Sequence, residues 1–220
     1  MDYKTEICKQ IQSMSGKYSV YAIFSDWIQM LALAFSNSMD ASFMQERERQ
    51  YMDIARKYTS EELKTIGDLT GMLTIAAEQE MMDILGFVYM HLEVSSKALG
   101  QFFTPYHLAK LAACMATIDK KEIERKGYMT VNEPSCGAGA NIIAFAERML
   151  EQGHNYQKEI LVTCQDLDWT AVYMCYVQLS LYGIPAVVVQ GDTLQRPYCG
   201  EEGSNVFRTP MYVLNAYRYD

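Results

Sequence analysis

Apolar residues in the first half of the chain recur at the spacing of an α-helix. Between Val20 and Phe35 each large apolar side chain has another three or four positions away, in the set Ile23, Phe24, Trp27, Ile28, Leu31 and Phe35. Such spacing puts them on one face of a helix. The segment QERERQYMDIARKY continues in a helical register, and its alternating Glu and Arg residues indicate a solvated helix face.

Two further signals extend the helical pattern. Thr59 followed by Glu62 is a capping-box pattern, which predicts the start of another helix. From Leu73 to Leu99 apolar residues again follow one helical face, and we expect no strand before about residue 125. The Met and aromatic residues here fit either a partner-binding groove or the core of a helix bundle, and the core is the favoured interpretation. We therefore predict a helical N-terminal domain over residues 1–98.

After Gly127 the pattern changes to short apolar runs that alternate with amphipathic segments. The predicted strands are Tyr128–Asn132, Glu159–Gln165 and Ala186–Gln190, and the predicted helices are Asn141–Leu150 and Trp169–Leu181. Strands that alternate with helices indicate an α/β fold with a parallel sheet and right-handed crossovers. We assign this unit to residues 99–220.

Composition and charge narrow the class of protein. The chain has 220 residues, of which 50% are hydrophobic and 21% are charged, as is usual for a globular protein. Its net charge of −8 disfavours tight DNA binding by this chain alone. No signal peptide and no apolar run of membrane-spanning length is present. We expect a cytoplasmic protein without membrane contact.

Six cysteines are scattered along the chain, at Cys8, Cys114, Cys136, Cys164, Cys175 and Cys199. They form no CxxC pair and no Cys/His cluster at metal-ligand spacing, so the sequence predicts no metal site. Several lie within apolar periodic segments, which suggests buried thiols in a reducing compartment.

Polar and glycine residues follow each predicted strand. The first strand is followed by Glu133 and the loop PSCGAG, the second by Asp166, and the third by Gly191 and Asp192. Ligands of parallel sheets bind outside the carboxyl ends of the strands. Glycines allow the backbone to approach a ligand closely, and a strand-end carboxylate accepts hydrogen bonds from ribose hydroxyls. These residues together predict a ligand that contains adenosine.

The spacing of the glycines disfavours two familiar alternatives. The dinucleotide fingerprint GxGxxG would need a third glycine where Ile142 stands. No lysine follows the glycines, so the loop is not a P-loop.

Four motifs together resemble adenine-specific (N6) DNA methyltransferases, above all the modification subunits of type I restriction systems. They are LGQFFTPYHLAKL at Leu99–Leu111, NEPSCGAGA, TCQDLD and VVVQGDTL, and the resemblance covers about residues 80–195. It implies a Rossmann-like fold that binds S-adenosylmethionine, DNA as substrate, and a place in a restriction-modification system. The family pattern continues beyond the strands that fit in this length, so the sheet is expected to be incomplete, with an exposed edge for a partner subunit or a second copy.

The resemblance also implies roles for individual residues. Phe103, Thr104 and Pro105 would cover the methionine end of the cofactor, and Glu133, followed by Pro134, would pair with its ammonium group. The turn that contains Cys136, Gly137 and Gly139 would assist. Asp166 would hold the ribose hydroxyls, Leu167 would pack on the adenine ring, and Asp192 would accept a hydrogen bond from the adenine amine.

Simpler interpretations stand beside some of these roles. Thr104 and Pro105 also fit the start of a helix. Asp168, next to the predicted ribose ligand, is favoured as the N-cap of the following helix. Cys136 is favoured as a small filler rather than a nucleophile.

One motif of the family is missing from the chain. Methyl transfer to an adenine amine uses Asn/Asp-Pro-Pro-Tyr/Phe in the related enzymes, and this chain contains no Pro-Pro. The available counterpart is VLNAYR at Val213–Arg218, where Asn215 would end a strand and Tyr217 would supply a stacking face. The favoured alternative makes Asn215 a surface residue of a C-terminal strand.

Two hypotheses of function follow. The first is a DNA adenine-N6 methyltransferase module that needs a partner chain. The second is a catalytically inactive relative that binds S-adenosylmethionine or a partner subunit and acts as a regulatory protein.

Overall fold

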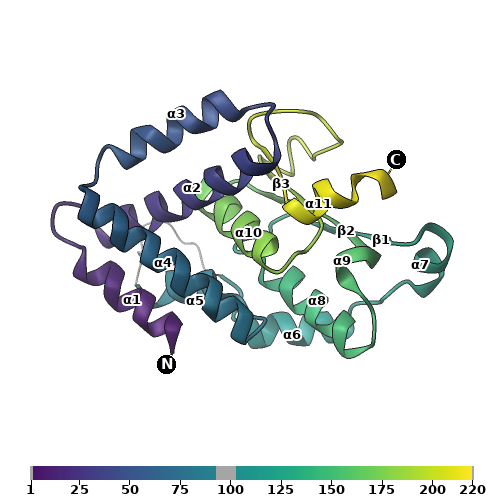
Figure 1. The fold of residues 1–220 in the computed structure, drawn as a ribbon. Helices are drawn as coiled ribbons and strands as arrows, with labels where there is room; N and C mark the ends of the chain where they lie inside the picture. Colours follow the sequence, from purple (N-terminus) through teal and green to yellow (C-terminus); the bar gives the residue numbers. More distant parts are fainter. Residues whose placement is uncertain (1, 93–102, 220) are drawn as a thin grey trace.

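The computed structural model describes residues 2–92 and 103–219 and is shown as a ribbon in Figure 1. As predicted, the described residues before position 93 form helices and no strand. These helices are α1 (Tyr3–Ser13), α2 (Val20–Met39), α3 (Met44–Ala55), α4 (Ser60–Gln79) and α5 (Ile84–His91).

Local capping explains where α4 and α5 begin. The predicted capping box is confirmed, because Thr59 Oγ1 accepts from the Glu62 N–H at 3.2 Å and Glu62 Oε2 accepts from the Thr59 N–H at 2.7 Å. The continuous helical pattern expected from Leu73 to Leu99 is wrong, because α4 ends at Gln79. The Asp83 side chain then accepts a hydrogen bond from the Gly86 N–H and starts α5 separately. The last part of that pattern, residues 93–99, lies outside the described residues.

The second half alternates helices and strands. Its helices are α6 (Tyr106–Met115), α7 (Lys120–Lys126), α8 (Ala140–Glu151), α9 (Tyr156–Glu159), α10 (Trp169–Leu181) and α11 (Pro210–Asn215). Its strands are β1 (Met129–Glu133), β2 (Ile160–Asp166), β3 (Ala186–Gln190) and β4 (Val206–Arg208). The three strands expected from the sequence therefore form, within one residue of the predicted bounds.

The strands make one sheet in the order β1-β2-β3-β4. The parallel pairing of β1 with β2 and of β2 with β3 confirms the predicted α/β class. The short β4 pairs with β3 in the antiparallel direction. Because β1 is at one end of this order, it is an edge strand among the described residues.

The predicted C-terminal strand over Val213–Arg218 is wrong. Residues 210–215 form α11, and Ala216–Arg218 form a single 3-10 turn. Thr209 supplies the N-cap oxygen, which accepts from the Tyr212 N–H at 3.4 Å, and Pro210 occupies the first turn, where its missing N–H has no cost. The Thr209–Pro210 pair thus starts a helix, although several of the residues after it have a high β-propensity.

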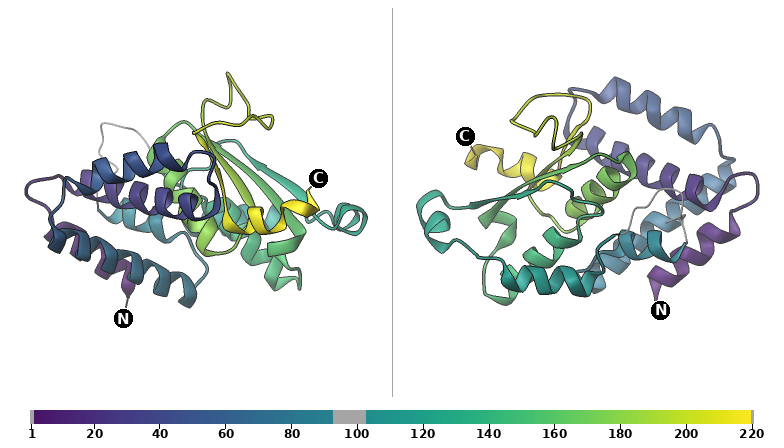
Figure 2. Two further views of the ribbon diagram at one scale, coloured as in Figure 1. Left: turned by 45° about the horizontal axis from the view of Figure 1, so that its top comes forward. Right: turned by 180° about the vertical axis from the view of Figure 1, so that it is seen from behind.

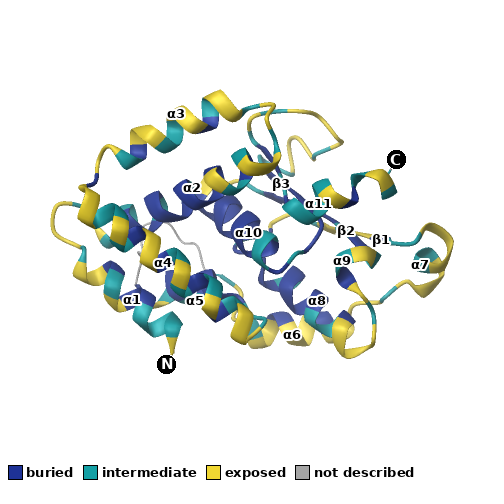
Figure 3. Ribbon diagram, in the orientation of Figure 1, coloured by how far each residue is buried: buried dark blue, intermediate teal, exposed yellow. Residues whose placement is uncertain are grey.

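The helical half and the sheet half lie side by side, with α2 packed against α10 at their junction (Figures 1 and 2). One cluster of buried apolar side chains extends through both halves, and α10 is almost entirely buried within it (Figure 3). The buried Arg47 of α3 donates to the carbonyl oxygen of Val206 at 2.9 Å across this junction. The expected boundary between residues 98 and 99 lies outside the described residues and stays a prediction. No helix in the described ranges is long and apolar enough to cross a bilayer.

Candidate functional site

The loop between β1 and α8 depends on two glycines. Gly137 has φ of +51° and Gly139 has φ of +94°, both in the left-handed region that favours glycine. A Cβ atom at Gly137 would come within 3.0 Å of the Phe103 ring, and one at Gly139 would come within 3.2 Å of Cys175 Sγ. The backbone conformation therefore favours glycine at both positions, and the neighbouring side chains leave little room for a Cβ atom.

Asp166, at the end of β2, holds this loop against the sheet. Its Oδ2 accepts a hydrogen bond from the Gly137 N–H at 2.8 Å, and its Oδ1 accepts one from the Asp168 N–H at 3.0 Å. The Cys136 N–H also donates to the carbonyl oxygen of Gln165 at 3.0 Å. Each Asp166 oxygen keeps a lone pair that can accept from a ligand.

A cavity of about 400 Å³ opens between the loop, the end of β2 and the chain before α6. Its lining consists of Phe103, Thr104, Ser135, Cys136, Gly137, Ala138, Ala140, Asn141, Asp166 and Ala171. Such a volume is within the range of small-molecule sites. The first turn of α8 has no side-chain cap, so its N–H groups are available to an anionic group of a ligand. Five predicted cofactor residues meet here: Phe103, Thr104, Cys136, Gly137 and Asp166.

Glu133 and Pro134 lie beside this cavity rather than in its lining. Glu133 Oε2 accepts from Asn141 Nδ2 at 3.1 Å, and the residue lines a groove along β1. The Pro134 carbonyl oxygen accepts from Thr193 Oγ1 at 2.6 Å, which ties the loop after β1 to the turn after β3.

Asp192 and Leu167 occupy different surroundings. Asp192 lines a neighbouring cavity of about 270 Å³, together with Gln165, Arg196 and Tyr198. Its Oδ1 accepts from the Leu194 and Gln195 N–H groups at 2.9 and 3.3 Å, so it closes its own turn. Leu167 is 66% exposed.

The structure decides two of the local alternatives. Asp168 is the N-cap of α10, because its side chain accepts from the Ala171 N–H at 2.9 Å. Pro105 is the N-cap residue of α6 without a side-chain hydrogen bond, so Thr104 does not cap that helix. The Phe103 ring packs edge-on against Tyr89, with the ring centroids 4.8 Å apart, and covers the loop at Gly137.

Two buried polar residues support the loop from below, and the sequence analysis missed both. Gln178 Nε2 donates to the Ala138 carbonyl oxygen and to Asp83 Oδ1, each at 2.8 Å, while its Oε1 accepts from the Leu85 N–H at 3.0 Å. Burial raises the pKa of Asp83, and the hydrogen bonds from Gln178 and the Gly86 N–H oppose this. A lone glutamine in the otherwise apolar stretch of α10 was the available signal.

Cys136 belongs to a group of three buried thiols beneath the loop. The neighbouring thiols of Cys136 and Cys175 lower the pKa of Cys164. Contacts with Cys136 and Cys164, together with burial, raise the pKa of Cys175, and the contact with Cys164 raises that of Cys136. Such burial is consistent with the expectation that Cys136 is not a nucleophile.

The segment that contains Asn215 and Tyr217 lies at the amino ends of the strands, whereas the cavity lies at their carboxyl ends. Asn215 Nδ2 donates to the Gln157 carbonyl oxygen at 2.9 Å, just before β2 begins. Arg218 contacts the Gly127 carbonyl oxygen before β1, and Tyr217 is 75% exposed. The interpretation that Asn215 ends a strand beside the cofactor is therefore wrong, because α11 carries this segment to the amino ends of the strands.

Comparisons with solved structures find methyltransferases at low similarity. A type I restriction-modification system methyltransferase subunit from Streptococcus thermophilus is 16% identical, with a TM-score of 0.49, over 88% of this chain and 44% of that one. A Listeria monocytogenes protein named as a putative class I S-adenosylmethionine-dependent methyltransferase is 10% identical, with a TM-score of 0.42, over 99% of this chain and 70% of that one. This chain thus spans less than half of the Streptococcus subunit.

The family assignment has a separate basis. A search of curated proteins finds no significant match. The family model described as N-6 DNA Methylase matches residues 80–214, which is more than half of the chain and includes the loop, Asp166 and all four strands. The chain belongs to the N-6 DNA methylase family.

Proposed function

We propose that the 400 Å³ cavity binds S-adenosylmethionine and that the chain is the cofactor-binding part of a DNA adenine-N6 methyltransferase of the restriction-modification type. The main observation behind this proposal is the hydrogen bond from the Gly137 N–H in the glycine loop to the Asp166 carboxylate. That contact brings an acidic strand end and a helix N-terminus to one cavity. The family match supports the same conclusion.

The residues around the cavity fit the chemical groups of this cofactor. The free lone pairs of Asp166 suit the ribose hydroxyls, and the uncapped N–H groups of α8 suit the carboxylate. The Phe103 ring would cover the methionine end and exclude water from it. When bound, S-adenosylmethionine supplies an electrophilic methyl group on a sulfonium. The carboxylate of Asp166 favours this positive charge near the strand ends.

The edge of β1 that has no partner strand among the described residues supports a role for a partner subunit. A groove of about 400 Å³ runs along β1, α6 and α8, and includes Val131, Ala112 and Phe145. On α6 the apolar side chains of Leu108, Leu111 and Met115 are 48%, 60% and 80% exposed. A strand with one open edge next to an apolar helix face is suited to pairing with another chain. We propose that such a partner completes the adenine pocket and supplies DNA contacts, because a net charge of −8 disfavours tight DNA binding by this chain alone.

A second candidate function has its own observation. Asn215 and Arg218 hold the segment that contains Tyr217 at the amino ends of the strands, on the far side from the cavity. This favours a chain that binds the cofactor or a partner subunit without catalysing methyl transfer by itself.

Calorimetric titration of S-adenosylmethionine into the purified chain tests the cofactor site. We expect binding that S-adenosylhomocysteine competes for and that Asp166→Ala weakens by about tenfold or more, since a hydrogen bond to a charged group contributes about 1.5–3 kcal/mol. The matched control is Asp68→Ala, which removes an exposed carboxylate of α4 and should leave the affinity unchanged. Equal affinities of the two variants would refute the site.

An assay of methyl transfer to DNA separates the two candidate functions. Radiolabelled S-adenosylmethionine is supplied with DNA, with and without candidate partner subunits. Transfer that appears with a partner supports the methyltransferase module. Cofactor binding without transfer under every condition supports the non-catalytic relative.

A further inference from the structure

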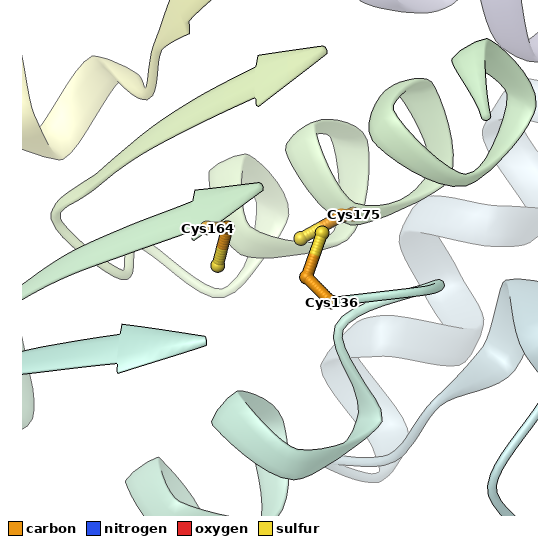
Figure 4. Close-up of side chains that lie close together, drawn as sticks. All are labelled: Cys136, Cys164 and Cys175. Atoms are coloured by element: carbon orange, nitrogen blue, oxygen red, sulfur yellow. The ribbon is translucent and has the colours of Figure 1, made fainter. Parts of the chain in front are cut away.

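Three cysteines that are far apart in the sequence meet beneath the glycine loop. Cys136 comes from the loop, Cys164 from β2 and Cys175 from α10, and their Sγ atoms all lie within 4.8 Å of one another (Figure 4). All three thiols are free. The exposed fractions are 6% for Cys136 and 0% for the other two, so the cluster is largely shielded from bulk solvent.

The donor set of this cluster is sulfur alone. Among the Cys, His, Asp and Glu side chains of the described residues, the three cysteines form the group whose ligand atoms lie close enough together to bind one ion. Thiolates select soft ions such as Cu(I), whereas Ca²⁺ and Mg²⁺ require oxygen ligands. Zinc in structural sites takes four protein ligands, one more than this cluster offers. A soft ion that accepts three ligands therefore fits best.

The spacing of the sulfur atoms is compatible with three-coordinate binding. If each metal–sulfur bond is about 2.3 Å, as in zinc–thiolate sites, sulfurs in a trigonal plane lie about 4.0 Å apart. Because all Sγ atoms lie within 4.8 Å of one another, no pair would have to move closer by more than about 1 Å to reach this distance. We propose that Cys136, Cys164 and Cys175 form a three-sulfur site for a soft, thiophilic cation of the Cu(I) type. Binding releases thiol protons to solvent and needs no oxidant or reductant when the ion arrives as Cu(I).

The cavity of the proposed cofactor site provides the entrance. Cys136 lines this cavity as well as belonging to the cluster, so an ion can reach the sulfurs past the loop. Binding would join the loop after β1, the strand β2 and the helix α10 through one ion. It therefore stabilises the folded state, since the unfolded chain does not hold the three sulfurs together.

Anaerobic titration with Cu(I), buffered by a chromophoric chelator, tests the site. A background variant with Cys8→Ala, Cys114→Ser and Cys199→Ser leaves only the three clustered thiols. We expect it to bind one Cu(I) per chain, with three sulfur ligands in its X-ray absorption spectrum, and to unfold at a higher temperature with Cu(I) than without. Adding Cys175→Ser to this background should weaken Cu(I) affinity by about 100-fold or more, since loss of an outer-shell partner alone costs about 10–100-fold.

The complementary variant is the matched control. It keeps Cys8, Cys114 and Cys199 and carries Cys136→Ser, Cys164→Ser and Cys175→Ser. Circular dichroism establishes that each variant is folded, and the background variant tests the site even if the serine variants do not fold. Binding of Cu(I) by the complementary variant but not by the folded background variant would overturn the proposal. So would a spectrum with oxygen or nitrogen ligands, or a background variant that binds no Cu(I). Because metal stoichiometry is measured without S-adenosylmethionine, these outcomes are independent of the cofactor proposal.

Discussion

The two ends of the strands hold the two sets of residues that the sequence suggested as functional. We call the side of the sheet at the carboxyl ends the carboxyl edge, and the side at the amino ends the amino edge. At the carboxyl edge, the glycine loop, Asp166 and Phe103 meet around one cavity. At the amino edge, Asn215 closes the C-terminal segment onto the chain before β2. The carboxyl edge thus combines tight backbone geometry with free acceptors and N–H groups. The amino edge uses its polar side chain for a contact within the protein.

The difference shows when a sequence motif is enough to predict where a functional residue lies in the fold. The glycine loop is a strand–turn–helix unit, so its position relative to β1 and α8 is set by adjacent residues. Asn215 had no such frame, because its position depended on whether its own segment formed a strand or a helix and on where that segment packed. We therefore expect changes at the carboxyl edge to alter ligand affinity, and changes at the amino edge to alter stability alone.

The largest effect is expected for Gly137→Ala. The substitution places a Cβ at φ of +51° and 3.0 Å from the Phe103 ring. We expect the free energy of unfolding, measured with urea, to fall by about 2–3 kcal/mol, from backbone strain and overpacking together. S-adenosylmethionine affinity should fall by about tenfold or more, since the loop lines the cavity.

Gly153→Ala is the matched control for this change. Gly153 also has positive φ, of +81°, but a Cβ atom at this position would meet no other atom within 4 Å. Its cost should be the backbone strain alone, about 1–2 kcal/mol, with unchanged ligand affinity. Equal costs for the two variants would mean that the contact with Phe103 does not constrain the loop.

Asn215→Ala tests the amino edge. The change removes the donor to the Gln157 carbonyl oxygen and leaves that oxygen without this partner. We expect the free energy of unfolding to fall by about 1–2 kcal/mol. Cofactor affinity measured by calorimetry should be unchanged. A clear loss of cofactor affinity would contradict the conclusion that residues at the amino edge affect stability alone.

The pH dependence of stability tests the support beneath the loop. Burial raises the pKa of Asp83 above its ordinary value of 3.8, so the folded chain holds the proton more tightly than the unfolded chain. The resulting stability is fully present below the ordinary pKa and is lost as pH rises through the raised one. Asp83→Asn keeps an oxygen for the Gly86 N–H and for Gln178, and carries no charge.

We therefore expect Asp83→Asn to gain stability relative to the natural chain as pH rises. Urea unfolding of both proteins between about pH 4 and pH 8 measures the difference. A difference that is constant over this interval would show that Asp83 does not titrate differently in the two states.

The smallest effect is expected for Tyr217→Ala. Tyr217 is 75% exposed and follows α11 at the amino edge. Its removal should change the free energy of unfolding by less than about 0.5 kcal/mol, as is usual for surface positions. Methyl transfer by a complete assembly, if it depended on Tyr217 for stacking, would fall despite this unchanged stability.

Much of the fold could be predicted because its signals are local. The capping box at Thr59, the bounds of β3 and α10, and the N-cap role of Asp168 all depend on residues within one turn or one strand. The break between α4 and α5 could not be predicted, since the apolar pattern continues through it. Asp83 caps α5 there and meets Gln178, which is distant in the sequence.

The sequence by itself determined the strand–loop–helix unit of the candidate site, because left-handed glycines and a helix start act over a few residues. Only the tertiary structure decided which side chains share one space. It turned Asn215 away from the cavity, moved Asp192 into a neighbouring one, and brought three scattered cysteines within 4.8 Å of one another. The physical reason is that packing between distant segments sets these positions, and no pattern along the chain encodes the distance between them.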